Sequence, residues 1–215
     1  MHTKWRKPLR NAIGSIINYD AEEWDPVAQN IRIKGQLGEY VRIYDRSYQN
    51  LFVCIDISEP INYYEDYAKV FEFFDHRRGG IRNRFKKIHL NYWAKGSFTP
   101  APIFIKKTIR AMGLYEKTEE CLEKAILSVE TSSAFATSIF NPFMIGNKWH
   151  KLKPELIIVL TKARFINDIE QQYRIRLKKY IKKVVWICVD DVDGNYLSTI
   201  LDIDSKAQER ILLVK

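Results

Sequence analysis

The stretch Leu51-Phe-Val-Cys-Ile-Asp-Ile-Ser58 is an apolar run that ends in a carboxylate and a hydroxyl. A near-continuous apolar run of this length, rich in β-branched and aromatic residues, is typical of a parallel strand that is covered on both faces. In open α/β sheets, ligands bind at the carboxyl ends of such strands. The stretch therefore predicts a central buried strand that places Asp56 and Ser58 where a binding site would lie.

Further segments predict the rest of a sheet. Residues 87–93, 154–161 and 182–190 are apolar runs of strand length. Helical spacing of apolar residues over 61–78 predicts a helix before the first of these runs, and the amphipathic stretch 166–181 predicts another between the last two. Strands and helices that alternate in this way predict an α/β fold with a doubly wound, mostly parallel sheet flanked by helices.

The remaining segments complete the expected domain. Prolines restrict residues 98–105 to an edge strand or an extended loop. Residues 116–129 carry the apolar stripe of a helix, and the end of the chain adds a helix or a strand through 211–214. We expect residues 1–47, which hold only short alternating pieces, to be an N-terminal extension of an α/β domain formed by residues 48–215.

Composition limits the class of protein. The chain has 215 residues, of which 46% are hydrophobic and 28% charged, enough for a full buried core. No apolar run approaches the roughly 20 residues of a membrane span, and the first ten residues lack the apolar centre of a signal peptide. These features predict a cytoplasmic protein without a membrane partner. The scattered Cys54, Cys121 and Cys188 predict buried free thiols.

Basic residues are concentrated in two segments of a chain whose formal net charge is +9. Residues 77–110 contain no Asp or Glu and interleave basic with aromatic residues, and the predicted helix before the last strand has a basic face over 174–183. This mixture suits phosphate contacts with base stacking, although a core strand flanked by solvated cations explains it as well. The candidate nucleic-acid contacts are Arg77, Arg78, Arg82, Arg84, Lys86, Lys87, Arg174 and Lys178.

Three strings carry a resemblance to a known family: Asp56-Ile-Ser58, Ser138-Ile-Phe-Asn-Pro142 and Leu160-Thr-Lys162. Their order and spacing resemble those of von Willebrand factor A-like (VWA-like) domains of bacteria and phages, in the branch described as predicted metallopeptidase-like. In that family the corresponding motifs form the metal-ion-dependent adhesion site (MIDAS), which holds a cation such as magnesium through serine, threonine and carboxylate oxygens. The resemblance covers about two thirds of the chain and implies a VWA-like fold.

The departures from the family motifs predict a degenerate metal site. Pro60 stands where the family has its second serine, and Lys162 stands for an aspartate. The threonine position is Ser138 or, with the alignment shifted by one residue, Thr137. A lysine at that place repels a divalent cation. We therefore expect no cofactor at Asp56, Ser58, Ser138 and Lys162, with magnesium as the alternative. The hypothesis is an ion pair between Lys162 and Asp56; otherwise Lys162 extends into solvent and Asp56 caps the next helix.

The motifs leave two classes of function. The sequence has no P-loop, nucleophile elbow or HExxH string, so we do not expect an enzyme. The resemblance implies a non-enzymatic protein-interaction or assembly module, whose partner is another protein such as an AAA+ ATPase or a larger complex. The alternative is a nucleic-acid-binding protein that uses the basic surface of residues 77–110 and 174–183.

Overall fold

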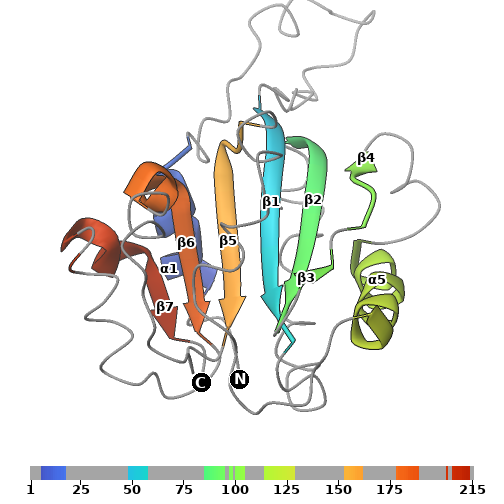
Figure 1. The fold of residues 1–215 in the computed structure, drawn as a ribbon. Coiled ribbons are helices and arrows are strands. Elements are labelled where there is room, and N and C mark those ends of the chain that lie inside the picture. Colours follow the sequence, from blue (N-terminus) through green and yellow to red (C-terminus); the bar gives the residue numbers. More distant parts are fainter. Residues whose placement is uncertain are drawn as a thin grey trace, which may run out of the picture.

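The computed structural model of the chain describes residues 6–17, 48–57, 85–94, 97–98, 100–104, 114–128, 153–161, 178–188, 202 and 205–213. A seven-stranded sheet lies at its centre, and five strands in it run parallel (Figure 1). The parallel strands are β1 (Tyr48–Asp56), β2 (Phe85–Trp93), β5 (Leu156–Thr161), β6 (Val184–Cys188) and β7 (Ile211–Leu213). The predicted α/β fold with a mostly parallel sheet is therefore confirmed.

The strand order is β3-β2-β1-β5-β6-β7. The short strands β3 (Ser97–Phe98) and β4 (Ile103–Phe104) both pair antiparallel with β2 and lie at that edge of the sheet. The two short strands match the edge strand that the prolines of this segment predicted, because proline cannot donate a hydrogen bond inside a sheet. The strand β1 therefore lies inside the sheet, between β2 and β5.

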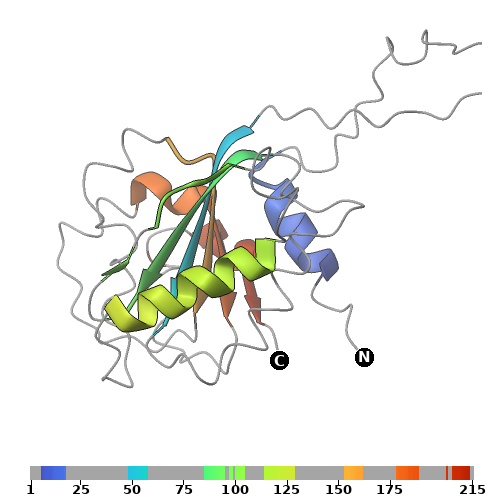
Figure 2. The same cartoon turned by 90° about the vertical axis from the view of Figure 1, so that its right-hand side faces the viewer.

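Both faces of the sheet are buried. On one face, side chains at alternate positions of β1, such as Val53 and Ile55, join a single hydrophobic core with the helices α1 (Arg6–Gly14) and α5 (Leu114–Ser128). On the other face, Phe52 and Cys54 are also buried. Figure 2 shows the sheet from its edge, with α1 on one side and the helical turn before β6 on the other. Burial on two faces explains why these strands are continuous apolar runs.

The helix α1 belongs to the same core as the sheet. Leu9, Ala12 and Ile13 are buried, and the latter two follow Leu9 by three and four residues, which places them on one helix face. The sequence analysis assigned this part of the chain to an N-terminal extension, and the domain division after residue 47 stays a prediction. Within that segment, residues 6–17 pack into the core, whereas residues 18–47 lie outside the described residues.

Other boundaries follow burial closely. The strand predicted over 182–190 begins two residues later, because the exposed Lys182 and Lys183 form the 3₁₀ turn η2 (Ile181–Lys183) and the buried run starts with β6. The helix predicted over 116–129 is α5. A helix or a strand was expected at the end of the chain, and the described residues there form the 3₁₀ helix η3 (Ser205–Arg210) followed by β7.

Two further expectations concern the side chains and the membrane. Cys54, Cys121 and Cys188 are buried thiols that form no disulfide with one another, as predicted. Among the described helices, none is both long and apolar enough to cross a membrane. The helix predicted over 61–78, most of the one predicted over 166–181 and the short alternating pieces before β1 lie outside the described residues.

Candidate functional site at the carboxyl end of the sheet

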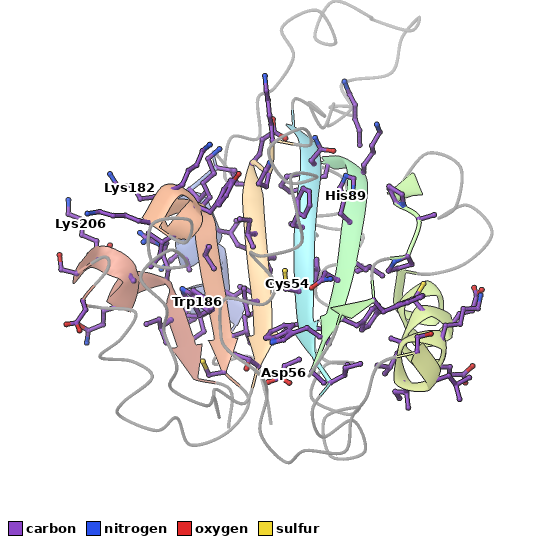
Figure 3. The ribbon with its side chains drawn as sticks, in the orientation of Figure 1. Cys54, Asp56, His89, Lys182, Trp186 and Lys206 are labelled. Carbon is purple, nitrogen blue, oxygen red and sulfur yellow. The ribbon has the colours of Figure 1, made fainter. Side chains whose placement is uncertain are left out.

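Asp56 is the last residue of β1, and Thr161 is the last residue of β5. Between these two neighbouring strands the strand order of the sheet reverses. From β1 the next parallel strand, β2, lies on one side, whereas from β5 the next one, β6, lies on the other side. Such a reversal is the place where open α/β sheets bind ligands, at the carboxyl ends of the strands. Figure 3 shows the side chain of Asp56 at this end of the sheet.

A buried hydrogen bond joins the two strand ends. Thr161 donates its hydroxyl hydrogen to Asp56, with 2.8 Å between Oγ1 and Oδ2, and both residues are 0% exposed. The register explains the contact: Ile55 lies opposite Leu160, so the next residue of each strand falls side by side. A hydrogen bond to a carboxylate is shorter and stronger than one between neutral groups. The carboxylate is therefore held by the neighbouring strand.

Trp93 flanks the carboxylate on the other side. It lies opposite Asp56 in the pairing of β1 with β2, and the backbone N–H of Ile57 donates to its carbonyl oxygen at 2.9 Å, which extends that pairing by one residue. The indole is 0% exposed, and within the described residues its Nε1 has no hydrogen-bond acceptor. Among the described residues, Asp56 thus accepts the Thr161 hydroxyl from β5 and lies opposite Trp93 of β2.

The thiols on this face of the sheet are inert. Cys188 lies opposite Thr161 in the pairing of β5 with β6, and burial raises its pKa to about 12. Burial also raises the pKa of Cys54, two residues before Asp56, far above its usual range. A protonated, buried thiol is neither a nucleophile nor a metal ligand. Both cysteines therefore act as small apolar residues of the core.

The side chains described at this end of the sheet do not make up a magnesium site. Magnesium takes six oxygen ligands in octahedral geometry. The described side chains supply the Asp56 carboxylate and the Thr161 hydroxyl, and that hydroxyl already directs its hydrogen at the carboxylate. In the described ranges, no group of three or more His, Cys, Asp and Glu side chains is placed to hold a metal ion. A cation here would depend on residues beyond those ranges.

The predicted site residues have different outcomes. Asp56 lies at the strand end, as predicted, whereas Ser58, Ser138 and Lys162 lie outside the described residues, so the ion pair between Lys162 and Asp56 stays a prediction. The sequence analysis missed Thr161 as the partner of Asp56. A hydroxyl at the end of a second buried strand was the available signal, because parallel strand ends meet at one end of a sheet.

The described candidates for nucleic-acid contact lie at the opposite, amino end of the sheet. Lys86 is exposed and Lys87 half-buried at the start of β2, and Lys178 is exposed shortly before η2 and β6. The structure thus brings parts of the two basic segments to one end of the sheet. The remaining candidates, Arg77, Arg78, Arg82, Arg84 and Arg174, lie outside the described residues.

A polar network connects three strands at the same amino end. The imidazole of His89 donates from Nε2 to Asn50 Oδ1 at 2.9 Å, and the backbone N–H of Asn50 donates to Glu155 Oε2 at 2.9 Å. The His89 ring also stacks on Phe52, with 4.5 Å between ring centroids. Burial, and secondarily the charge of Lys87, lower the pKa of His89 to about 4. His89 is therefore a neutral structural residue at pH 7.

Comparison with known proteins yields distant structural matches. No protein-family model matches the chain, and no curated protein matches it. Among solved structures, proximal thread matrix protein 1 from the mussel byssus has 13% sequence identity over 71% of this chain, with a TM-score of 0.45. The match covers 41% of that protein, so this chain spans less than half of its length.

Two bacterial structures match over most of their length. BatB from Bacteroides thetaiotaomicron has 16% identity over 77% of this chain and 88% of its own, with a TM-score of 0.45. An aerotolerance-related membrane protein from Bacteroides fragilis has 12% identity over 77% of this chain and 90% of its own, with a TM-score of 0.43. At these identities and TM-scores, the likeness assigns neither a family nor a function.

Proposed function

We propose that the chain is a non-enzymatic protein-interaction module of VWA-like type, whose partner docks over the carboxyl end of the sheet. The supporting observation is the hydrogen bond from Thr161 to the fully buried Asp56 at the point where the strand order reverses. In this arrangement the carboxylate joins two central strands instead of holding a cation. The carboxyl end then contributes a docking surface without metal chemistry.

Lys162 is part of this proposal. It follows Thr161 directly and stands where the resembling family has a metal-binding aspartate. A lysine close to Asp56 compensates its negative charge internally and repels a divalent cation. Ser58 and Ser138 then serve as polar positions of the docking surface and not as metal ligands. The site is degenerate as a MIDAS and retained as a surface.

The proposal also includes the kind of partner that binds at this end of the sheet. The resemblance of the three strings to VWA-like domains of bacteria and phages supports another protein as the partner, either an AAA+ ATPase or a larger assembly. A cytoplasmic location is part of the same proposal. Burial of the described side chains at this end, among them Asp56 and Trp93, means that the contacts must come from the residues that follow the strands.

The decisive experiment compares the two ends of the sheet. The full-length tagged chain is captured from its host after nuclease treatment and high-salt washing, as wild type and as the variants Lys162→Glu and Lys182→Glu. Both variants make the same charge change, one directly after β5 and one in the exposed turn before β6. We expect Lys162→Glu to lose a protein partner that wild type and Lys182→Glu retain.

Two results would overturn this proposal. One is equal recovery of the partner with Lys162→Glu and wild type, when circular dichroism shows both variants folded. The other is loss of every associated protein from the wild type after nuclease treatment, which would mean that nucleic acid had bridged them. A partner lost only with Lys182→Glu would move the docking surface to the amino end.

A further inference from the structure

Exposed lysines form a row along the amino end of the sheet. Since β2, β5 and β6 are parallel, the residues that lead into them lie at one end of the sheet. In Figure 3, Lys182 lies at this end and Asp56 at the opposite end. The exposed members of the row are Lys86, Lys153, Lys178, Lys179, Lys182 and Lys183.

Few negative charges accompany the row. Among the described residues that lead into β2, β5 and β6, Glu155 is the single acidic residue, and its Oε2 accepts the backbone N–H of Asn50. Lys183 Nζ donates to the carbonyl oxygen of Pro154 at 2.9 Å, which ties η2 to the start of β5. Within the described ranges, none of Lys86, Lys153, Lys178 and Lys182 forms an ion pair. Within the part of the chain that the structure describes, these four exposed charges therefore have no carboxylate partner.

The row ends beyond β6. Beyond β6, the helix η3 carries the exposed Lys206 together with the exposed Glu209, so the surface there has mixed charge. Neighbouring strands lie about 4.8 Å apart, so β2 and β6, three strand steps apart, are separated by about 14 Å. About 14 Å of duplex carries about four phosphates on each strand. The row therefore matches a short length of nucleic-acid backbone.

The chemistry of the row favours a phosphate backbone over an acidic protein. Protein interfaces need an apolar core inside their polar rim. The exposed large hydrophobic residues of the described chain are Ile126 and Leu127, both on α5 and not at this end of the sheet. Lysine is a point charge that contacts phosphates without the fixed geometry of arginine, and the nearby aromatic residues Phe85 and Tyr180 are buried. These features suit backbone contacts that read no base.

We infer that the amino end of the sheet, through Lys86, Lys153, Lys178 and Lys182, binds the phosphate backbone of nucleic acid without sequence preference. This surface is separate from the docking surface proposed at the carboxyl end. The chain would then hold a nucleic acid at one end of the sheet and a protein partner at the other.

The test measures the binding of labelled duplexes of two unrelated sequences by fluorescence anisotropy across a range of salt concentrations. The variant Lys86→Gln/Lys182→Gln removes one charge from each end of the row. Its matched control, Lys117→Gln/Lys124→Gln, removes two charges from α5. We expect the row variant to bind both duplexes at least tenfold more weakly and to reduce the salt slope by about 2, while the control stays near wild type.

Each other outcome overturns the inference. The inference is overturned if the wild type binds no duplex at low salt. It is also overturned if the control variant loses as much duplex affinity as the row variant, because the net charge alone would then explain the binding. If polyglutamate displaces the labelled duplex as effectively as unlabelled duplex does, the surface binds acidic proteins and not specifically nucleic acid. Should the double variant fail to fold, the single variant Lys178→Gln is measured in its place, with an expected loss of about 1 in the salt slope.

Discussion

Thr161 and Asp56, 105 residues apart in the chain, are joined by a 2.8 Å hydrogen bond between the ends of two parallel strands. The hydroxyl satisfies a carboxylate that has no exposure to water. Burial of a charged group is tolerated only when hydrogen bonds or counter-charges replace its hydration. The pair therefore connects the stability of the sheet to the place where a ligand would bind.

Removal of the Thr161 hydroxyl is expected to destabilise the fold. Thr161→Val keeps the shape of the side chain but takes a hydrogen bond from a buried carboxylate, at a cost of about 2 kcal/mol in the free energy of unfolding. The control Thr161→Ser retains the hydroxyl and loses one methyl group, at a cost of about 1 kcal/mol. Urea denaturation at pH 7 measures both. A valine variant as stable as the serine variant would contradict this account of the pair.

Magnesium is expected to leave the stability of the wild type unchanged. A cation at 100 times its Kd would add about 2.7 kcal/mol to the free energy of unfolding. Thermal melts in magnesium and in EDTA should give the same Tm, whereas Asp56→Ala should lower the Tm equally in both, because the Thr161 hydroxyl loses its acceptor. A higher Tm of the wild type in magnesium than in EDTA would restore a functional metal site.

Acidification is expected to weaken the fold through His89. Its pKa of about 4 in the folded state lies below the ordinary 6.5, so the unfolded chain takes up the proton first. The stability that the neutral His89 side chain contributes to the fold is present in full above pH 6.5 and is lost as the pH falls from 6.5 towards 4. The expected loss at pH 5 relative to pH 7 is about 2 kcal/mol.

The variant His89→Gln isolates that contribution. Glutamine keeps a donor for Asn50 but does not titrate, so the difference in stability between wild type and variant should shrink as the pH falls from 7 to 5. Urea denaturation at the two pH values measures it. A difference that is independent of pH would show that His89 takes up its proton equally in the folded and unfolded chain.

The helix α1 provides a test of the domain division. Ile13 is 0% exposed within the core shared with the sheet, so Ile13→Ala should cost about 2–5 kcal/mol in a single cooperative transition. The exposed Asn11 on the same helix is the control, and Asn11→Ala should change stability by no more than about 0.5 kcal/mol. Unfolding of α1 in a separate, earlier transition would support an independent extension of residues 1–47.

The strands were predictable because their burial leaves a local signal. A strand such as β1 or β5 that is covered on both faces must be apolar at nearly every position, and that run is visible without knowledge of the fold. The predicted start of β6 was wrong by two residues. Lys182 and Lys183 directly precede the apolar run and were counted with it, but they belong to the turn η2. The pattern shows where burial begins but does not distinguish a strand from the turn that leads into it.

The sequence alone identified the sheet, its central strand and Asp56 as a polar group at the end of that strand. It also predicted one basic surface from residues 77–110 and 174–183, which include Lys86 and Lys182. It did not identify Thr161 as the hydrogen-bond partner, nor Lys153 and the amino end of the sheet as parts of that surface. Both depend on which strands are neighbours and in what register they pair. Local apolar patterns determine that a strand is buried, whereas its neighbours follow from the packing of the whole chain, so these contacts appear only in the folded protein.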